Sequence, residues 1–501
     1  MQFAVQRIGF FVGPIAALCL YFALPDQYVD THKALIPLTF SAKTTICMVV
    51  WMAIWWLSEA IDISATALLP IATFPLLGIA DIKATTAPYA SHLIFLFMGG
   101  FLIALAMQRW KLDHRLANTV LKLAGNNPYL IIAGFMFSAA ALSAFISNTA
   151  TTAVMLPIGL SVIALFTVNQ QEKFSNSCQH NFARCMMLGI AYSASVGGTM
   201  TLIGTAPNLF LASFLQDSIS SEYRLEISFI KWLSFAAPLA IIFLPIIWFV
   251  LTRFVFPFKA DALYQPQESH THHEKMNRGQ KITIIVFITT VFIWMTRPLL
   301  QKITITVNQQ EIQPLFQLSD SGIAMLGAML LFIIPVDFKR RIFVIDWATT
   351  KKLPWGIFIL FGGGLTLANA IKTNGVAEYI ASQALFLQNV PDVVFVLIIC
   401  AGVIFLTELT SNTATTATLV PILASISVGA GIHPYLLVFP ATLAASFAFM
   451  MPIATPPNAI VFGSGHITIP EMCKAGLWLN IAGVILITIF TFFVIKPVLG
   501  F

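Results

Sequence analysis

Long apolar runs, separated by short polar turns, follow one another along almost the whole chain. Most of them are long enough to cross a bilayer as one helix, which takes about 20 residues. They lie near residues 8–25, 44–60, 64–80, 91–109, 185–215, 229–256, 280–298, 322–336, 354–371, 432–465 and 472–498. The pattern predicts an all-α polytopic membrane protein with about 11 transmembrane helices.

Two further apolar stretches, 128–168 and 390–428, are about twice as long as a single span. Each is interrupted near its middle by the polar triplet Ser-Asn-Thr, which begins at Ser147 in the first and at Ser411 in the second. We therefore expect two re-entrant hairpins, each made of two half-helices that enter and leave the membrane on the same side.

Composition agrees with a membrane protein and excludes several other classes. Hydrophobic residues make up 58% of the chain and charged residues 10%, whereas soluble domains have about 45–50% apolar and about 25% charged residues. A soluble globule, a disordered chain and a disulfide-stapled secreted module are thereby excluded. The net charge of +6 needs no nucleic-acid partner, because basic cytoplasmic loops explain it.

The distribution of lysine and arginine predicts the orientation. With the N-terminus inside and the C-terminus outside, most of the 27 basic residues fall on the cytoplasmic side, as the positive-inside rule requires. The polar segment 257–279 becomes a cytoplasmic linker. Its His270, His272 and His273 are expected to be solvated, since no further ligand stands at metal-binding spacing. A bacterial inner membrane is the expected location, although no targeting signal decides it.

The two halves of the chain carry the same motifs in the same order. Residues 147–153 and 411–417 both read Ser-Asn-Thr-Ala-Thr-Thr-Ala, at an offset of 264 positions. Further on, Gly204–Asn208 matches Ala454–Asn458, with Thr, Pro and Asn in common. Because the first hairpin enters from inside and the second from outside, the repeats are inverted. Inverted repeats with broken helices are a plan known from secondary transporters.

The two triplets suit an anion. Ser, Asn and Thr are common N-cap residues, so each triplet marks the start of a returning half-helix. Such a start has free backbone N–H groups and the positive end of the helix dipole, and together these form an anion site. The carbonyl oxygens just before each triplet suit a small cation.

The second motif pair interrupts long apolar spans. Its prolines remove backbone donors and force the helix to unwind, which is tolerated at membrane depth only where the backbone is buried or lines a cavity. The exposed carbonyls can complete a cation shell. A simple proline kink is the alternative, which the matching of the two copies disfavours.

Neither motif region contains lysine or arginine. A dianion bound there needs charge from elsewhere, and bound cations supply it most simply. Na⁺ fits a neutral oxygen cage, whereas a proton-coupled carrier usually needs a titratable carboxylate. Glu408 is the one nearby candidate, but Ala144 stands at its place in the first half. We expect Glu408 to have a structural or gating role.

The paired Ser-Asn-Thr motifs and the two Thr-x-Pro-Asn breaks resemble those of the divalent anion/sodium symporter family. This resemblance covers about residues 40–498. It implies about 11 spanning segments, two re-entrant hairpins, a homodimer and an elevator-like transport domain. Its members carry succinate, fumarate or malate, and some carry citrate or sulfate. Exchanger branches more often have an arginine soon after the triplet, and none stands there in this chain.

The resemblance also implies a set of site residues. One sodium site falls at Ser143, Ser147, Asn148 and Gly204, and a second at Thr407, Thr410, Asn412 and Ala454. Substrate contacts fall at Asn148, Thr149, Asn412, Thr413 and Thr455, with Thr205 and Pro456 adjacent.

The resulting expectation is a secondary active transporter that couples Na⁺ entry to uptake of a C4-dicarboxylate. Its regions are scaffold helices at 1–127 and 280–389, transport regions at 128–256 and 390–501, and the linker 257–279. A sodium-independent exchanger of the same fold is the alternative. An intramembrane enzyme is disfavoured because neither motif has a His or Lys base nearby, and a channel because hairpins from both sides suit alternating access. The preferred anion and the number of sodium ions stay open.

Overall fold

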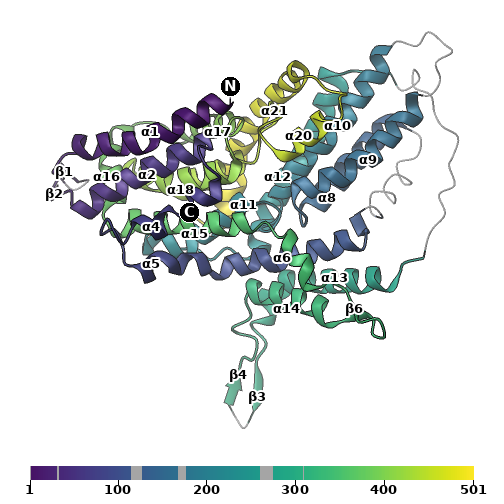
Figure 1. Cartoon of the computed structure of the whole chain (residues 1–501), viewed down its shortest axis with the longest axis horizontal. Coiled ribbons are helices and arrows are strands. Elements are labelled where there is room, and N and C mark those ends of the chain that lie inside the picture. Colours follow the sequence, from purple (N-terminus) through teal and green to yellow (C-terminus); the bar gives the residue numbers. More distant parts are fainter. Residues whose placement is uncertain are drawn as a thin grey trace.

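The protein is almost entirely helical in a computed structural model that describes residues 2–30, 33–113, 115, 127–167, 176–259, 275–307 and 310–501. Figure 1 shows its helices packed into one elongated body. Three short antiparallel strand pairs are present in these ranges, β1–β2 (Gln27–Val29, Leu35–Pro37), β3–β4 (Ile305–Val307, Gln310–Ile312) and β5–β6 (Pro335–Asp337, Ile342–Phe343). The β3–β4 hairpin projects away from the body (Figure 1). The histidines of the linker lie outside the described residues.

The first half begins with helices that precede the first hairpin. They are α1 (Gln2–Ala23), α2 (Phe40–Ser58), α3 (Ile63–Thr66), α4 (Leu69–Thr73), α5 (Ile82–Thr86), η1 (Ala87–Ala90) and α6 (His92–Arg109). Then come α8 (Pro128–Ser143), α9 (Asn148–Thr167), α10 (Asn176–Thr199), α11 (Ala206–Ser213), η2 (Phe214–Ser218), η3 (Ser221–Tyr223), α12 (Phe229–Phe249) and η4 (Val250–Val255).

The second half repeats this order. It contains α13 (Arg278–Leu300), α14 (Asp320–Ile333), η6 (Trp347–Lys352), α15 (Trp355–Thr373), α16 (Val376–Gln383) and η7 (Leu385–Leu387). These are followed by α17 (Asp392–Thr407), α18 (Asn412–Gly429), α19 (Tyr435–Ala444), α20 (Pro456–Phe462), α21 (Ile469–Phe490), η8 (Thr491–Ile495) and α22 (Lys496–Leu499).

The two interrupted stretches form helix–turn–helix pairs, α8–α9 and α17–α18. Equivalent helices of the two pairs begin 264 residues apart: α8 and α17 begin at Pro128 and Asp392, and α9 and α18 begin at Asn148 and Asn412. The long span expected at 185–215 is broken between α10 and α11, and the one at 432–465 between α19 and α20. Each break therefore lies just before a Thr-x-Pro-Asn motif.

One expected span differs. Residues 64–80 do not form a single helix but the short helices α3 and α4, joined and followed by turns. Pro70 is the second residue of α4, and Gly78 has a φ of 64°. Proline fits the first turn of a helix and not its interior, so Pro70 favours a new helix start there, and a left-handed glycine ends a helix. The apolar content of this segment was a poorer guide than its turn residues.

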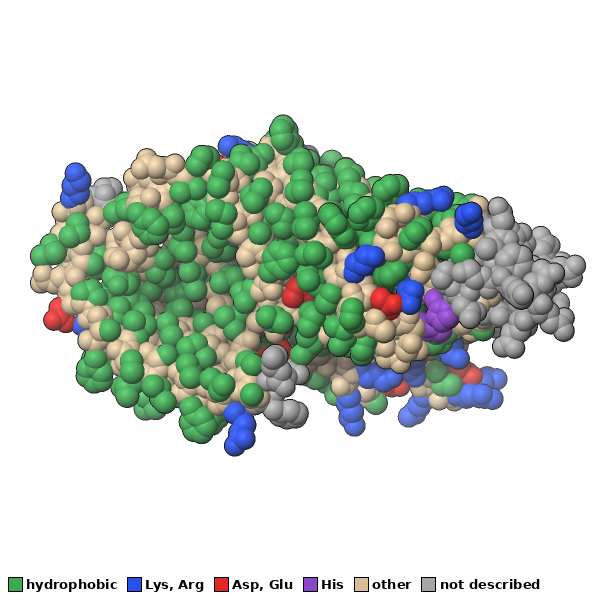
Figure 2. Space-filling model, turned by 90° about the horizontal axis from the view of Figure 1, so that it is seen from above, with side chains coloured by type: hydrophobic (Ala, Val, Ile, Leu, Met, Phe, Trp, Pro, Cys, Tyr) green, Lys and Arg blue, Asp and Glu red, His purple; other side chains and the backbone are tan. Residues whose placement is uncertain are grey.

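Seven helices in the described ranges are long and apolar enough to cross a membrane by length and composition. Six shorter apolar helical segments, including α8, α14, α17 and α19, accompany them. Figure 2 shows a face covered largely by hydrophobic side chains, with lysine and arginine gathered toward one end. Such a surface is stable against lipid and not against water, so the protein is an integral membrane protein.

Close helix packing relates the two halves. Adding a Cβ atom at Gly99 of α6 would place it 2.6 Å from the Ala324 carbonyl carbon of α14. At the equivalent Gly363 of α15, the added Cβ atom would lie 2.4 Å from the Ala67 carbonyl oxygen. Only glycine permits this approach. The two equivalent helices thus use equivalent glycines to reach a neighbour's backbone.

The second helix of each hairpin, α9 or α18, packs against a helix of the other half. Helix α9 of the first hairpin packs against α20, which follows the second break, and α18 of the second hairpin packs against α11, which follows the first break. Helix α10 contacts both α8 and α9, and α19 contacts both α17 and α18. Each hairpin is thus held by its own broken helix and by the last part of the other one.

Candidate functional site

The first hairpin brings together three of the four residues predicted for one sodium site. Asn148 is the first residue of α9, and its Oδ1 accepts a hydrogen bond from Ser143 Oγ at 2.6 Å. A Cβ atom added to Gly198 would lie 2.3 Å from this same Oδ1, and one added to Gly204 would lie 2.4 Å from the Gly198 carbonyl oxygen. Ser143, Asn148 and Gly204 therefore surround the end of α10, with Gly198 between them.

Ser147 has a different contact. Its Oγ accepts the N–H of Ala150 at 3.3 Å, and its carbonyl accepts that of Thr151 at 3.0 Å. These are the bonds of an N-cap residue. The Ser147 side chain therefore caps the half-helix.

The second hairpin repeats the central contact. Thr407 Oγ1 donates to Asn412 Oδ1 at 2.7 Å and lies 3.0 Å from the carbonyl oxygen of Ala445, which follows α19. Thr410 lies apart from this contact, because its hydroxyl bonds the Leu406 carbonyl and the Thr415 hydroxyl. The Thr410 hydroxyl is thus engaged within the hairpin. Ala454 is buried, and its N–H donates to the Met451 carbonyl.

The asparagines that end the Thr-x-Pro-Asn motifs hold the breaks in shape. The Asn208 amide nitrogen lies 2.8 Å from the Thr201 carbonyl and 3.2 Å from that of Gly198. The Asn458 amide does the same with Met451 at 3.0 Å and Ala448 at 3.1 Å. Both side chains are fully buried. They satisfy carbonyls that the interrupted helices leave without intrahelical partners.

Thr205 and Thr455 precede the helices after the breaks in nearly the same backbone conformation, with φ of −145° and −143°. Thr455 Oγ1 accepts the Asn458 N–H, whereas the Thr205 side chain forms no cap. Proline follows in both cases and fits the first turn of a helix, where its missing N–H is not needed. The repeat thus extends to backbone geometry.

The candidate substrate residues differ in accessibility. Thr149 and Pro456 are exposed, Asn148, Thr205, Asn412 and Thr413 are half-buried, and Thr455 is buried. Asn148 and Thr149 belong to α9, and Pro456 belongs to α20, which packs against α9. Residues of the first hairpin and of the second break therefore lie on neighbouring helices.

Glu408 lies at the tip of the second hairpin and is 4% exposed. Its carboxylate accepts the backbone N–H groups of Phe449, Met450 and Met451 at 2.7–3.0 Å. It also accepts the Asn480 amide of α21 at 2.7 Å. The carboxylate thus ties the hairpin tip to the second break.

Sequence reasoning missed several residues around the breaks. Thr201 Oγ1 donates to the Ala144 carbonyl and accepts the Gly204 N–H at 3.1 Å. Trp232 Nε1 donates to the Thr199 carbonyl at 3.0 Å, and the Tyr192 hydroxyl donates to the Phe449 carbonyl at 2.7 Å. Asn480 had a signal, since a single amide in an apolar span is costly unless it is partnered. For the others, the distant partner could not be read from local sequence.

The fold and the paired broken helices define a class of helical membrane proteins. Two solved structures support this fold: the YdaH transporter of Alcanivorax borkumensis has a TM-score of 0.64 at 12% identity, covering 99% of each chain. MtrF of Neisseria gonorrhoeae has a TM-score of 0.58 at 15% identity, covering 98% of this chain and 94% of its own.

Sequence comparison gives the family. Residues 15–499 match the family described as the sodium:sulfate symporter transmembrane region. The chain is 37% identical to the sodium-dependent dicarboxylate transporter SdcS of Staphylococcus saprophyticus and 38% identical to that of Staphylococcus aureus. Each comparison covers 99% of this chain and 92% of the relative. The chain belongs to the divalent anion/sodium symporter family.

Proposed function

We propose that the protein is a secondary active transporter that couples inward Na⁺ flow to the uptake of a C4-dicarboxylate such as succinate, fumarate or malate. The observation that carries this proposal is the repeated oxygen pair, Ser143 with Asn148 and Thr407 with Asn412, next to two helix N-termini. The sodium-dependent dicarboxylate transporters at 37–38% identity support the same ion and substrate class.

Each oxygen pair forms one wall of a sodium site. Hydroxyl, amide and carbonyl oxygens are neutral, so a small cation bound by them keeps its full positive charge. Gly204 and Ala454 contribute backbone oxygens from the breaks, Ser147 and Thr410 theirs from the tips. Filled sites place positive charge beside the N-termini of α9 and α18.

The dianion then binds against Asn148 and Thr149 on one side and Asn412 and Thr413 on the other. Thr205, Thr455 and Pro456 complete the contact from the breaks. Dipoles of two helix ends amount to about half a charge each, so bound sodium supplies the remaining compensation. This dependence makes anion binding conditional on sodium.

The two hairpins are re-entrant in this proposal, and transport is of the elevator type. Residues 128–256 and 390–501 form the moving part, and 1–127 and 280–389 form the scaffold of a homodimer. The protein lies in a bacterial inner membrane, with its N-terminus and the linker 257–279 inside and its C-terminus outside.

Uptake into proteoliposomes tests the proposal. Labelled succinate is expected to accumulate with an inward sodium gradient and not with an inward potassium gradient. Asn148→Ala and Asn412→Ala are each expected to abolish this uptake. Both variants are expected to stay folded and to elute as a single peak from a size-exclusion column. Ser161→Ala, at an exposed position of α9 remote from both tips, is the matched control and retains uptake.

The alternative is a sodium-independent exchanger of the same fold. It predicts counterflow of labelled succinate against internal succinate when sodium is absent on both sides. Such counterflow, with uptake insensitive to Asn148→Ala, would refute sodium coupling. A panel of succinate, malate, fumarate, citrate and sulfate then identifies the substrate.

A further inference from the structure

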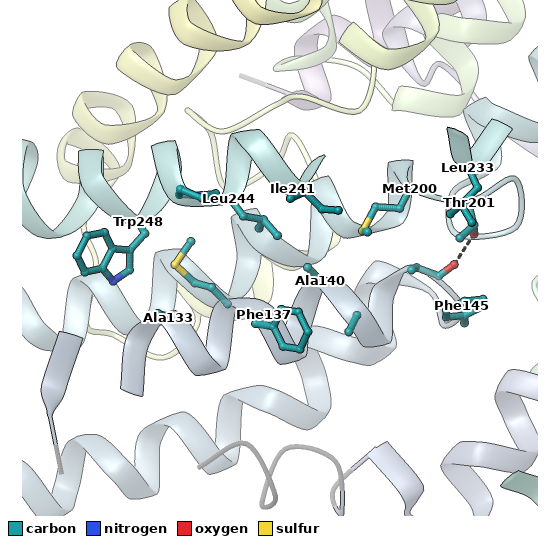
Figure 3. A pocket seen from close by; sticks show the side chains of 14 residues that line it. Ala133, Phe137, Ala140, Phe145, Met200, Thr201, Leu233, Ile241, Leu244 and Trp248 are labelled. Carbon is teal, nitrogen blue, oxygen red and sulfur yellow. Dashed lines mark hydrogen bonds between the residues drawn. The ribbon is translucent and has the colours of Figure 1, made fainter. Parts of the chain in front are cut away.

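An apolar groove lies beside the first hairpin, between α8 and α12, and has a volume of about 630 Å³. Figure 3 shows it with Trp248 at one end and Phe145, Thr201 and Leu233 at the other. Thr201 is the polar side chain among its lining residues, and its hydroxyl is already bonded to the Ala144 carbonyl. Nothing else in the lining offers water a hydrogen-bonding group from a side chain, apart from the Trp248 indole.

That indole is also taken, because Trp248 Nε1 donates to the Tyr129 carbonyl at 3.0 Å. The groove therefore has no side-chain donor or acceptor left for water. An unfilled groove would forfeit the dispersion contacts of its walls. The material that surrounds α8 and α12 must fill it, and two exposed apolar side chains in its lining, Phe137 and Ile241, favour hydrocarbon as this material.

The second repeat differs at the positions that line this groove. Along α8 and the turn that follows it, the groove wall contains Ala133, Ala140, Ala141 and Ala144. The equivalent positions in and just after α17 hold Leu397, Ile404, Phe405 and Glu408. All four side chains are larger than alanine; Ile404 is buried, Leu397 and Phe405 are exposed, and α17 packs directly against α21.

One end of the groove has a positive charge. Arg253 is exposed, its guanidinium lies 4.1 Å from the centre of the Tyr129 ring, and its NH1 is 3.2 Å from the Tyr129 hydroxyl. Tyr129 in turn contacts Trp248, with ring centres 6.2 Å apart. Aromatic residues with arginine at the end of a span mark the membrane–water interface.

We propose that this groove is a phospholipid site, with one acyl chain between α8 and α12 and the phosphate at Arg253. The chain gains little from leaving the bilayer, because lipid tails are as apolar as the groove. Retention therefore rests on filling a preformed void and on the charge pair. An arginine near the surface favours an anionic lipid by about 1 kcal/mol, or roughly fivefold.

The bound chain would lie against the tip of the first hairpin. Ala144 and Phe145 belong to the turn between α8 and α9, and Thr201 binds both the Ala144 carbonyl and the Gly204 N–H. The lipid thus supports the wall of the first break from the membrane side, as Glu408 supports the second break from within the protein. This site does not depend on what the protein transports.

Native mass spectrometry of the full chain tests the site. The protein is stripped in detergent and supplied with equal amounts of phosphatidylglycerol and phosphatidylcholine. We expect one phosphatidylglycerol to remain at collision energies that remove all other lipid. Ala141→Phe, which places in α8 the ring that α17 has at Phe405, is expected to abolish this retention.

Two variants complete the test. Ala401→Phe, which gives α17 the ring that α8 has at Phe137, adds the same volume outside the groove and is expected to retain the lipid. Arg253→Gln is expected to retain a chain while reducing the preference for phosphatidylglycerol about fivefold.

Retention of the same lipid by Ala141→Phe would overturn the proposal, as would equal loss in Ala401→Phe. Should Ala141→Phe fail to fold, Ala133→Phe blocks the other end of the groove and is judged by the same criterion. Retention of detergent or fatty acid in place of phospholipid by the wild type would also refute it.

Discussion

The two hairpins have the same triplets and the same helix ends, yet their tips are held differently. In the second hairpin, the buried Glu408 accepts three backbone N–H groups of the break and the Asn480 amide. In the first, Ala144 stands at that place, and the Thr201 hydroxyl joins tip and break through the Ala144 carbonyl. The two copies of the motif thus share the oxygen pair, but different contacts join the hairpin tip to the break.

The second helices of the two hairpins, α9 and α18, differ in burial. Ala153, Pro157 and Ser161 of α9 are exposed, while the identical residues Ala417, Pro421 and Ser425 of α18 are buried. Helix α18 is covered by α2, α15 and α16, whereas the main partners of α9 are α10 and α20. Identical sequence therefore faces different surroundings, which shows that burial here is decided by the fold and not by the residue.

The largest expected effect comes from Glu408. Glu408→Ala leaves the N–H groups of the buried Phe449 and the half-buried Met450 and Met451, together with the Asn480 amide, without this acceptor, at about 1–3 kcal/mol each. The sum is comparable to the whole stability of a protein, about 5–15 kcal/mol, so little folded protein is expected. Yield of monodisperse protein and its denaturant midpoint measure this. Thr201→Val in the first repeat should cost only about 1 kcal/mol, and equal losses would contradict the comparison.

Asn208→Ala and Asn458→Ala should have smaller and nearly equal effects. Each removes one buried amide that donates to carbonyls at a break, for a cost of about 1–3 kcal/mol. Equality is expected because the distances to the carbonyls are alike in the two repeats. Denaturant unfolding of both variants provides the measurement, and a difference above about 1 kcal/mol would show that the breaks are less alike than their geometry.

A cysteine pair sharpens the contrast in burial. In a variant without the native cysteines, Ala153→Cys should react with N-ethylmaleimide at least about tenfold faster than Ala417→Cys, the equivalent of about 1.4 kcal/mol in accessibility. The physical reason is the cover that α2, α15 and α16 give to α18. Mass spectrometry of timed samples measures both rates. Equal rates would mean that α18 is uncovered in solution.

The smallest effect is expected at Thr410. Its hydroxyl is occupied by Leu406 and Thr415, so Thr410→Ala should change the sodium concentration for half-maximal uptake by less than about twofold. Thr407→Ala, which removes the hydroxyl bonded to Asn412, should raise it far more. A larger effect of Thr410→Ala than of Thr407→Ala would reverse the assignment of side chains at this site.

Several features followed from the sequence alone. The repeat, the two helix–turn–helix pairs, the breaks before Thr-x-Pro-Asn and the start of α9 and α18 within each triplet depend on caps, prolines and apolar length. These act within a few residues, so local pattern suffices to predict them. The single span predicted for residues 64–80 is wrong, because Pro70 and Gly78 divide this apolar stretch into short helices and turns.

Tertiary structure decided the remainder. The packing of α9 on α20 and α18 on α11, the partners of Glu408 more than 40 positions along the chain, and the groove beside four alanines all involve distant residues. An alanine in sequence shows only that space is available, and whether a neighbour fills that space depends on how far apart two helices are held. Here α17 packs directly against α21, whereas a groove lies between α8 and α12. Identical motifs therefore have different surroundings.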